Sequence, residues 1–376
     1  MSQLLVEVCK VLDLQPHPNA HSLDVATVKG WETIVRKRTI KAGDFVIFIP
    51  PDSILPASLH SFLGITNYCA QLPFNYYDNF AKYRPTARRV KAARIRGVSS
   101  YGTIMTLKQF NIYITKNTSQ KKKPSTLPSL IEGDNVVSQL KITKWEPPIK
   151  STQGDVEKDH PNFIKYTDIE NVRNYPETIK YYEMVRILEK IHGTLCRVGY
   201  VYDQHLKKPI LTIGSKNTRR KPVDKKGHPT LYWEVLEWYP QIKECLESLY
   251  KRYQQSIILC GEIFGSEIQD LTYGLDRGIK DFRLFDIMVG NKYLNWDEVK
   301  NCCDHFNIPH PPILYIGPYS KSVVEKYTDG KTNLKPTGKF EGREGIVITP
   351  LVERTDPEVG RVIFKSVSVD YLNRQV

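Results

Sequence analysis

Short apolar runs separated by turn residues fill the first 145 positions of the chain. Such runs indicate β-strands, because Pro, Asn, Gly and Asp lie between them where turns are expected. The clearest runs are Leu4–Val8, Val25–Val28, Glu32–Val35 and Phe45–Ile49. Regularly spaced short strands predict a small β-barrel, which we assign to residues 1–145.

From residue 161 onwards the pattern changes to mixed helix and strand. Residues 231–253 carry apolar side chains at helical spacing, and residues 296–306 predict a second helix. The apolar positions of the first helix are Val235, Leu236, Ile242, Leu246, Leu249 and Tyr250. Strands lie between and around these helices without βαβ alternation, so residues 161–376 predict an α+β domain. Residues 146–160, rich in Pro, Gly and Asp, are the expected linker.

One lysine in this second domain has the setting of a nucleophile. The run Met184–Leu188 is apolar enough for a buried strand, and Gly193 and Thr194 mark a turn. Lys190 therefore lies near a strand end, where desolvation and a nearby cation can remove its proton. Taken alone, a lysine at a strand end is more often an ordinary solvated residue.

Four later strand-like segments each carry a chemically useful side chain. These are Glu262 after Ile257–Gly261, Phe285 and Asp286 within Phe282–Ile287, Glu344 before Gly345–Ile348, and Lys365 within Arg361–Ser366. Taken singly, the glutamates could be strand-end carboxylates, Phe285 a core residue and Lys365 a surface lysine. Asp286 is expected to be a structural carboxylate or one that supports a residue of the site. The order of all five segments is more specific than any one of them.

In this order the segments resemble the covalent nucleotidyltransferase superfamily, which contains polynucleotide ligases and mRNA capping enzymes. The motifs are K-x-H-G at Lys190, G-E at Glu262, F-D-I at Phe285, E-G-I-V at Glu344 and a final apolar strand with Lys365. A barrel placed before the catalytic domain resembles the Deinococcus-type ATP-dependent RNA ligases, whose N-terminal domain is OB-like. Two local runs agree, at residues 42–48 and 163–168, and the resemblance covers nearly the whole chain.

The resemblance implies an activity and a site. Lys190 would attack ATP to form lysyl-AMP, and AMP would pass to an RNA 5′-phosphate before a 3′-OH displaces it. Glu262 and Glu344 would hold Mg²⁺ or Mn²⁺, Lys365 would bind the α-phosphate, and Phe285 would stack on adenine. The implied catalytic residues are Lys190, Glu262, Glu344 and Lys365. The implied nucleotide-binding residues are Glu189, Lys190, Ile191, Lys216, Glu262, Phe285, Glu344 and Lys365.

Three positions depart from the family pattern. The lysine motif usually has aspartate where this chain has His192, although K-x-H-G occurs in the phage and kinetoplastid double-strand RNA ligases. Lys216 replaces an arginine, which keeps the charge but loses the bidentate fork. Ile363 stands where a second lysine is common. The role of His192 stays open at this point.

The balance of charge favours a polyanionic partner. Formal net charge is +13, which suits nucleic acid, although surplus surface lysine would give the same value. Residues 82–96 are rich in Lys and Arg, and they predict a basic strand that either follows a nucleic-acid backbone or is a charged, solvated edge. The predicted nucleic-acid contacts are Arg88, Arg89, Lys91, Arg94 and Arg96, with Lys82 and Arg84 in the same run. The resemblance implies RNA with 3′-OH and 5′-phosphate ends, in duplex or nicked form, and a monomeric enzyme.

Cysteine use and hydropathy suggest the compartment. Seven scattered cysteines without a C-x-x-C pair indicate reduced thiols and argue against a zinc site. We see neither a signal peptide nor an apolar run long enough for a membrane span. The expectation is an intracellular protein, cytoplasmic or nuclear, with no membrane partner.

Two rival interpretations remain at this stage. A capping guanylyltransferase or DNA ligase would carry its barrel after the last motif, where few residues follow Lys365. A non-catalytic RNA-binding protein on a decayed ligase scaffold would explain the departures at His192, Lys216 and Ile363. The joint presence of Lys190, Glu262, Glu344 and Lys365 argues against decay, because a dead site has no need for buried charge.

Overall fold

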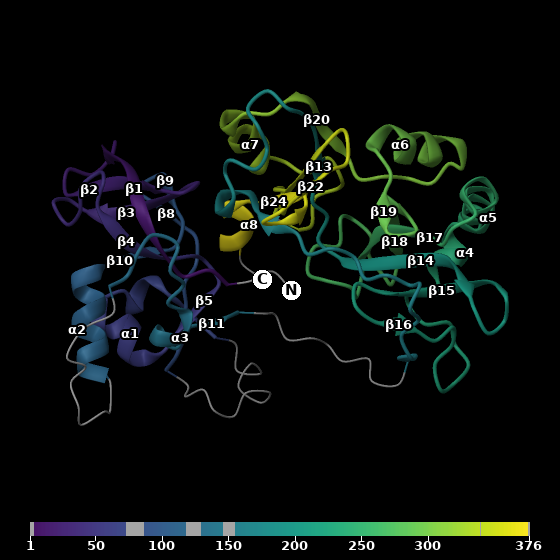
Figure 1. Ribbon diagram of the computed structural model, residues 1–376, viewed down its shortest axis with the longest axis horizontal. Helices are drawn as coiled ribbons and strands as arrows, with labels where there is room; N and C mark the ends of the chain where they lie inside the picture. Colours follow the sequence, from purple (N-terminus) through teal and green to yellow (C-terminus); the bar gives the residue numbers. More distant parts are fainter. Residues whose placement is uncertain (1–3, 73–85, 118–128, 146–154, 339, 375–376) are drawn as a thin grey trace. The chain divides into compact units, whose positions relative to one another are not determined.

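The chain folds into two compact units. The computed structural model describes residues 4–72, 86–117, 129–145, 155–338 and 340–374. Unit 1 comprises Met1–Lys150 and Val172–Pro176, and unit 2 comprises Ser151–Asn171 and Glu177–Val376 (Figure 1). The chain therefore returns to unit 1 once, over a short segment, before it completes unit 2.

Unit 1 is built on a curled five-stranded antiparallel sheet, in the order β10-β4-β1-β2-β3. Side chains of β2 alternate between buried and half-buried, as expected for a strand with one face on a core. Tyr101 N–H donates to Glu32 O at 2.8 Å, which ties the outer strand β3 to the chain just before β10. The strands are β1 (Glu7–Pro16), β2 (Leu23–Val28), β3 (Trp31–Arg36), β4 (Phe45–Ile49) and β10 (Thr103–Thr106).

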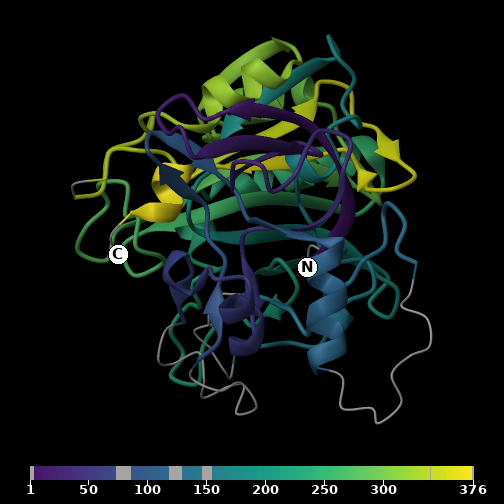
Figure 2. The same ribbon diagram turned by 90° about the vertical axis from the view of Figure 1, so that its left-hand side faces the viewer.

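In its described part, unit 1 also has a smaller sheet, a hairpin, three α-helices and the 3-10 helices Thr66–Tyr68 and Val172–Asn174. In both Figure 1 and Figure 2, α1 and α2 lie on one side of the purple strands. The sheet has the order β11-β5-β7-β6, and β8 and β9 form a separate hairpin. The bounds are β5 (Ser53–Leu55), β6 (Ala70–Gln71), β7 (Arg88–Arg89), β8 (Ala93–Ile95), β9 (Val98–Ser100), β11 (Thr143–Lys144), α1 (Ala57–Phe62), α2 (Leu107–Asn117) and α3 (Val137–Leu140).

The predicted basic strand at residues 82–96 is wrong as a single element. Its described part contains two short strands in different sheets, β7 and β8. Val90 N–H donates to Ser53 O at 2.8 Å, so the chain leaves β7 still bound to its neighbour before it turns into the hairpin. Lys82 and Arg84 lie outside the described residues.

Unit 2 contains two sheets that carry the predicted motifs. One has the order β12-β24-β21-β13-β20 and the other β16-β15-β14-β17-β18-β19. The first comprises β12 (Glu170–Asn171), β24 (Phe364–Val367), β21 (Gly345–Pro350), β13 (Met184–Glu189) and β20 (Ile313–Pro318). The second comprises β16 (Arg219–Arg220), β15 (Lys208–Ser215), β14 (Thr194–Asp203), β17 (Ile257–Gly265), β18 (Lys280–Val289) and β19 (Lys292–Tyr293). Strands β22 (Thr355–Asp356) and β23 (Gly360–Arg361) form a separate pair.

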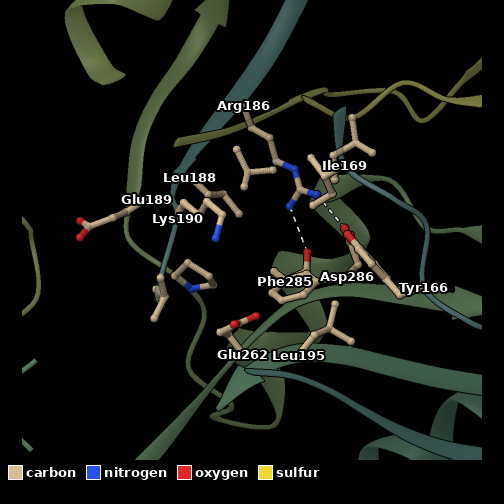
Figure 3. Close-up of a pocket in the computed structure, with 14 residues that line it drawn as sticks. Tyr166, Ile169, Arg186, Leu188, Glu189, Lys190, Leu195, Glu262, Phe285 and Asp286 are labelled. Atoms are coloured by element: carbon tan, nitrogen blue, oxygen red, sulfur yellow. Dashed lines mark hydrogen bonds and ion pairs between the residues drawn. The ribbon is translucent and has the colours of Figure 1, made fainter. Parts of the chain in front are cut away.

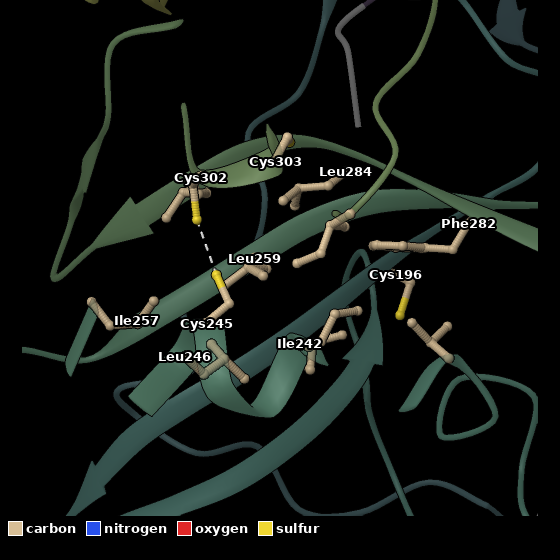
Figure 4. Close-up of a cluster of buried hydrophobic side chains, with 14 of the residues drawn as sticks. Cys196, Ile242, Cys245, Leu246, Ile257, Leu259, Phe282, Leu284, Cys302 and Cys303 are labelled. Atoms are coloured by element: carbon tan, nitrogen blue, oxygen red, sulfur yellow. Dashed lines mark hydrogen bonds between the residues drawn. The ribbon is translucent and has the colours of Figure 1, made fainter. Parts of the chain in front are cut away.

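The helices of unit 2 pack their apolar faces onto these strands. Figure 4 shows Cys245 and Leu246 of α5 facing Leu259 of β17, and Cys245 Sγ lies 3.0 Å from Cys302 Sγ of α6. Burial of such faces supplies most of the stability of the helices. The helices are α4 (Val235–Trp238), α5 (Gln241–Tyr253), α6 (Trp296–His305), α7 (Lys321–Thr328) and α8 (Val369–Asn373).

The two helix predictions had different outcomes. The helix predicted over residues 231–253 is wrong as one element, because α4 ends before Pro240 and α5 begins after it. Proline lacks the N–H that a continuous helix needs and clashes with the preceding turn. The second helix is confirmed as α6, which begins with a capping box between Asn295 and Glu298.

Most predicted strands are confirmed, with two shifts. The first strand runs over Glu7–Pro16 rather than Leu4–Val8, because pairing with β2 and β4 extends it past the apolar run. The last predicted strand, Arg361–Ser366, is divided between β23 and β24. No helix among the described residues is both long and apolar enough to cross a bilayer.

Candidate active site

The lysine segment lies between the two sheets of unit 2. Lys190 follows β13 directly, and its N–H donates to Gly345 O at the start of β21, at 3.0 Å. On the other side Gly193 approaches β17 so closely that a Cβ there would lie 2.1 Å from Ile263 O. Only glycine fits this approach, so Gly193 allows the segment to lie beside Glu262.

A pocket opens beside this segment, and its walls are mainly apolar (Figure 3). Its empty volume is about 540 Å³ with the open mouth included, which is the size of a small-ligand site. The lining residues are Tyr166, Ile169, Arg186, Leu188, Glu189, Lys190, Ile191, Leu195, Glu262, Phe285, Asp286, Pro311, Val347 and Ile363. A flat apolar group such as a nucleobase would fit between these side chains.

Two carboxylates accompany the lysine. Lys190 Nζ lies 2.8 Å from Glu344 Oε1, and in Figure 3 Glu262 faces the same space. Burial alone would lower the pKa of Lys190, but the charges of Glu344 and Glu262 reverse this effect and raise it. Burial also raises the pKa of Glu262 to about 8, with Lys190 opposing and Glu344 adding to the rise. In this arrangement Lys190 is protonated, and it needs a further cation to become a nucleophile.

The same carboxylates fit a divalent cation. Glu344 Oε2 is buried and has no hydrogen-bond partner among the described residues, and a buried carboxylate oxygen of this kind is costly unless a cation or donor reaches it. The described residues contain no group of three or more His, Cys, Asp or Glu arranged around a metal. Water and phosphate oxygens would therefore supply the other ligands, as is usual for Mg²⁺.

At the other end of the pocket the carboxylate is paired with arginines. Asp286 is buried, and it accepts hydrogen bonds from Arg186 Nη2 at 2.8 Å and Arg361 Nη1 at 2.7 Å. Tyr166 O–H donates to the same carboxylate. Although burial opposes it, the two arginines lower the pKa of Asp286 to about 2. Asp286 thus has the contacts expected of a structural carboxylate. Its two arginine partners were not predicted from the sequence, and an arginine within an apolar strand was the signal that could have indicated them.

Phe285 and Ile191, two of the implied nucleotide-binding residues, both line the pocket. The ring of Phe285 is half-buried and meets that of Tyr166 edge to face, with centroids 5.5 Å apart. Ile191 is buried beside Phe264 and Tyr273. Both side chains can contact a bound base.

The carboxylate of Glu189 points away from the pocket (Figure 3). It accepts hydrogen bonds from Asn333 N–H at 2.8 Å and from the Thr332 hydroxyl. Burial raises the pKa of Glu189, and these two donors oppose the rise. Any nucleotide contact of Glu189 would therefore come from its backbone and stem.

Lys365 and Lys216, the two remaining predicted lysines, differ in their position relative to the pocket. Lys365 lies opposite Val347 across β24 and β21, and residues paired in this way project to the same face, which is the pocket side. Lys216 lies at the end of β15, where its amine pairs with Asp168 and does not line the pocket.

The five predicted nucleic-acid residues fall into two groups. Arg89 Nε donates to Asp52 Oδ1 at 2.8 Å, and the Arg89 guanidinium carbon lies 3.6 Å from the centroid of the Trp145 ring. The guanidinium of Arg89 therefore already has partners within unit 1. Arg88 is half-buried on the same short strand. The exposed members are Lys91, Arg94 and Arg96 on and beside the β8–β9 hairpin.

Family models match part of the sequence of each unit. Residues 183–367 match a family model described as RNA ligase, and residues 5–107 match one described as an OB-fold domain. No curated protein sequence matches the chain.

Solved structures of an RNA ligase from Naegleria gruberi are similar over nearly the whole chain. A variant with AMP and Mn is 23% identical with TM-score 0.71, and another with ATP and Mn is 22% identical with TM-score 0.71; each match covers 98% of both chains. The form with PPi is 24% identical with TM-score 0.68, over 99% of this chain and 98% of that one. At this identity the likeness concerns the fold.

The chain therefore combines an OB-like sheet with a following α+β domain that resembles RNA ligases in its fold. Residues 183–367 are the part of the chain that is similar to the RNA ligase family.

Proposed function

We propose that this protein is an ATP-dependent RNA ligase that joins 3′-OH and 5′-phosphate ends through a lysyl-AMP intermediate. The observation that carries the proposal is the position of Lys190, 2.8 Å from Glu344 and at the edge of an apolar pocket that Glu262 also lines. The Naegleria gruberi RNA ligase structures support the proposal, because ATP and PPi are the reactant and product of lysine adenylylation and AMP is the group that is transferred.

The reaction would proceed in three transfers. Lys190 Nζ, after loss of its proton, attacks the α-phosphorus of ATP, and pyrophosphate leaves. The oxygen of an RNA 5′-phosphate then attacks the phosphorus of lysyl-AMP, which releases the lysine and leaves AMP on the RNA end. Finally a 3′-OH attacks the 5′-phosphate phosphorus, so that the phosphodiester forms and AMP leaves.

Each residue at the pocket has a defined task in this scheme. Phe285 stacks on adenine, and Lys365 binds the α-phosphate, where negative charge develops in the transition state. Glu262 and Glu344 would hold Mg²⁺ or Mn²⁺, which when bound would offset both carboxylates and lower the pKa of Lys190. Until then the two carboxylates keep the Lys190 amine charged and in place.

The substrate side of the proposal rests on unit 1. The order of an OB-like sheet before the ligase domain supports an enzyme of the Deinococcus type. Exposed Lys91, Arg94 and Arg96 would contact phosphates of a duplex or nicked RNA. We propose that the protein acts on such ends as a monomer in RNA repair.

The direct test is incubation with α-labelled ATP and Mg²⁺ followed by denaturing electrophoresis. The native protein should retain label and Lys190→Ala should retain none, because no other group replaces the nucleophile. Lys300→Ala, which changes a half-buried lysine of α6 that pairs with Asp304, is the matched control and should label like the native chain.

Other outcomes would change the proposal. Label from GTP but not from ATP would indicate a capping-type nucleotidyltransferase. Absence of label from both, in protein shown to be free of prior adenylylation, would favour an RNA-binding protein on a ligase scaffold.

A further inference from the structure

His192 occupies the position where related ligases usually have aspartate, and both nitrogens of its ring have partners. Nε2 lies 2.8 Å from Asp270 Oδ1, and Nδ1 lies 3.0 Å from the Tyr371 hydroxyl. The rings of His192 and Tyr371 meet edge to face with centroids 5.4 Å apart. Residues far apart in the sequence therefore fix the ring from two sides.

These partners also determine which ring nitrogen carries the proton. The ionised carboxylate of Asp270 can only accept a hydrogen bond, so His192 Nε2 donates to it. Nδ1 of the neutral ring is then an acceptor, and Tyr371 O–H donates to it. A histidine held in this way has one tautomer and one orientation.

Arg374 connects the same carboxylate to the C-terminal helix α8. Its Nε donates to Asp270 Oδ2 at 2.8 Å and its Nη2 to Oδ1 at 2.9 Å, which is a bidentate pair. The guanidinium lies over the Tyr371 ring, 3.6 Å from the centroid. The side chain is only 12% exposed, so solvent screens it less than a surface ion pair. We call Asp270, His192, Tyr371 and Arg374 the His192 cluster.

The His192 cluster reaches Glu344 by two routes. His192 Nδ1 lies 3.8 Å from Glu344 Oε2, the buried oxygen that has no hydrogen-bond partner among the described residues. Along the main chain, Ser368 at the N-cap of α8 donates its N–H to Glu344 O at 2.9 Å. Helix α8 thus supports both the backbone of Glu344 and the ring beside its carboxylate.

The backbone of His192 is fixed as well. Its N–H donates to the Tyr273 hydroxyl at 2.8 Å, and Tyr273 N–H in turn donates to Thr337 Oγ1 at 2.9 Å. Tyr273 adopts a left-handed conformation with φ 53°, which costs free energy and persists only where the surroundings impose it. The segment from Lys190 to His192 is therefore held at main-chain and side-chain level.

We infer that His192 is a positioning residue of the Lys190 site, and that helix α8 holds it there through Tyr371 and Arg374. The inference rests on the proposed function, since it concerns how fast Lys190 is adenylylated. An aspartate at position 192 would place its carboxylate towards that of Asp270, and like charges this close repel. The surrounding residues therefore explain why the chain has histidine at this position.

The first test removes one hydroxyl. Tyr371→Phe keeps the ring and its packing but leaves His192 Nδ1 without its donor. We expect the maximal single-turnover rate of Lys190 adenylylation to fall about tenfold to hundredfold, because small misplacement of reacting groups has effects of this size. The ATP concentration for half-maximal rate should change by less than about twofold, since Tyr371 is not a pocket residue.

A matched control separates positioning from general stability. Arg354 forms a bidentate pair with Glu183 at the opposite end of β13, with distances of 2.7 and 2.8 Å. Arg354→Ala and Arg374→Ala both break such a pair, but only Arg374→Ala should slow adenylylation at temperatures where both variants are folded. Equal rates in the two variants would overturn the inference.

The second test uses charge. His192→Asp should slow adenylylation, and adding Asp270→Asn should restore part of the rate because the repulsion is removed. If His192→Asp alone matches the native rate, or if the second change gives no recovery, the cluster has no positioning role.

A spectroscopic measurement tests the cluster without relying on activity. Nitrogen-15 NMR of the native protein, with His192→Asn to assign the signal, should show Nε2 protonated and Nδ1 unprotonated. Tyr371→Phe should shift the Nδ1 signal. A native protein that shows this pattern but never labels with ATP would refute the proposed function and retain the cluster, whereas the opposite tautomer would refute the cluster alone.

Discussion

The two ends of the pocket each hold a carboxylate, buried Asp286 at one and half-buried Glu262 at the other, and their electrostatic settings are opposite. Asp286 is bound by Arg186 and Arg361, and its pKa is lowered to about 2. Burial raises the pKa of Glu262 to about 8, because Lys190 opposes the rise only in part and Glu344 adds to it. The two arginines hold Asp286 in its charged form, whereas the charged form of Glu262 is disfavoured and would gain from a bound divalent cation.

The two ends of the pocket therefore have different roles. The Asp286 end joins β13, β18 and β23 by hydrogen bonds and so supports the wall on which Phe285 lies. The Lys190 end has an amine, two carboxylates and a carboxylate oxygen without a partner in the described part of the chain. Natural active sites commonly contain groups whose arrangement is unfavourable for stability but needed for activity.

The largest expected effect comes from breaking the compensated end. Asp286→Asn keeps the shape but leaves two buried arginines without their shared carboxylate. We expect the free energy of unfolding to fall by about 3–5 kcal/mol, as for other buried ion pairs that lose one partner. Urea denaturation followed by tryptophan fluorescence measures this value.

Asp304→Asn is the matched control for this prediction. Asp304 pairs with Lys300 one helical turn away on the exposed side of α6. Loss of such a surface pair should change the free energy of unfolding by less than about 1 kcal/mol. If Asp286→Asn were no less stable than this control, the Asp286 end would not be a structural centre.

The next expected effect is on activity. Glu262→Gln keeps the shape and removes the charge at the Lys190 end, and the maximal adenylylation rate should fall by about 10²–10³-fold. The unfolding temperature in metal-free buffer should not fall, because the fold already disfavours the charged form of Glu262. Single-turnover labelling and thermal unfolding of the same preparation measure both quantities.

The comparison with Asp286→Asn decides how this result is understood. If Glu262→Gln lowered the unfolding temperature as much as Asp286→Asn does, Glu262 would be a structural carboxylate too. Retention of activity would remove Glu262 from the catalytic residues.

The strands that carry the pocket residues could be predicted from the sequence, because continuous apolar runs indicate buried strands. β13, β17, β18 and β21 all lie where such runs predict them. Lys190, Glu262 and Phe285 were found through the order of their motifs, and the structure brings them to one pocket.

What the sequence could not supply is the pairing of distant side chains. Arg361 reaches Asp286 across the domain, and Tyr371 reaches His192 from the C-terminal helix. No local pattern specifies such contacts, because they depend on how β-strands and loops far apart in the chain are placed. The break between α4 and α5, in contrast, could have been predicted from the sequence. Pro240 disfavours a continuous helix, but the helix was assigned from the spacing of apolar residues alone.

The smallest expected effect is a difference in pH dependence between the two ends. The folded-state pKa of Asp286 is about 2 and its ordinary value is 3.8, so its contribution to stability is present above pH 4 and is lost as the pH falls towards 2. The gap in free energy of unfolding between the native protein and Asp286→Asn should shrink by about 1 kcal/mol from pH 5 to pH 3.

For Glu262 the sign is reversed, because its folded-state pKa lies above the ordinary value of 4.5. Its burial costs free energy once the unfolded chain ionises, so metal-free native protein should gain stability relative to Glu262→Gln as the pH falls from 8 to 5. Urea titrations of the three proteins over pH 3–8 test both signs with one assay. If the difference in free energy of unfolding between native protein and variant changed in the same direction with pH for both variants, the two carboxylates would be in similar settings. The proposed contrast between the two ends of the pocket would then be wrong.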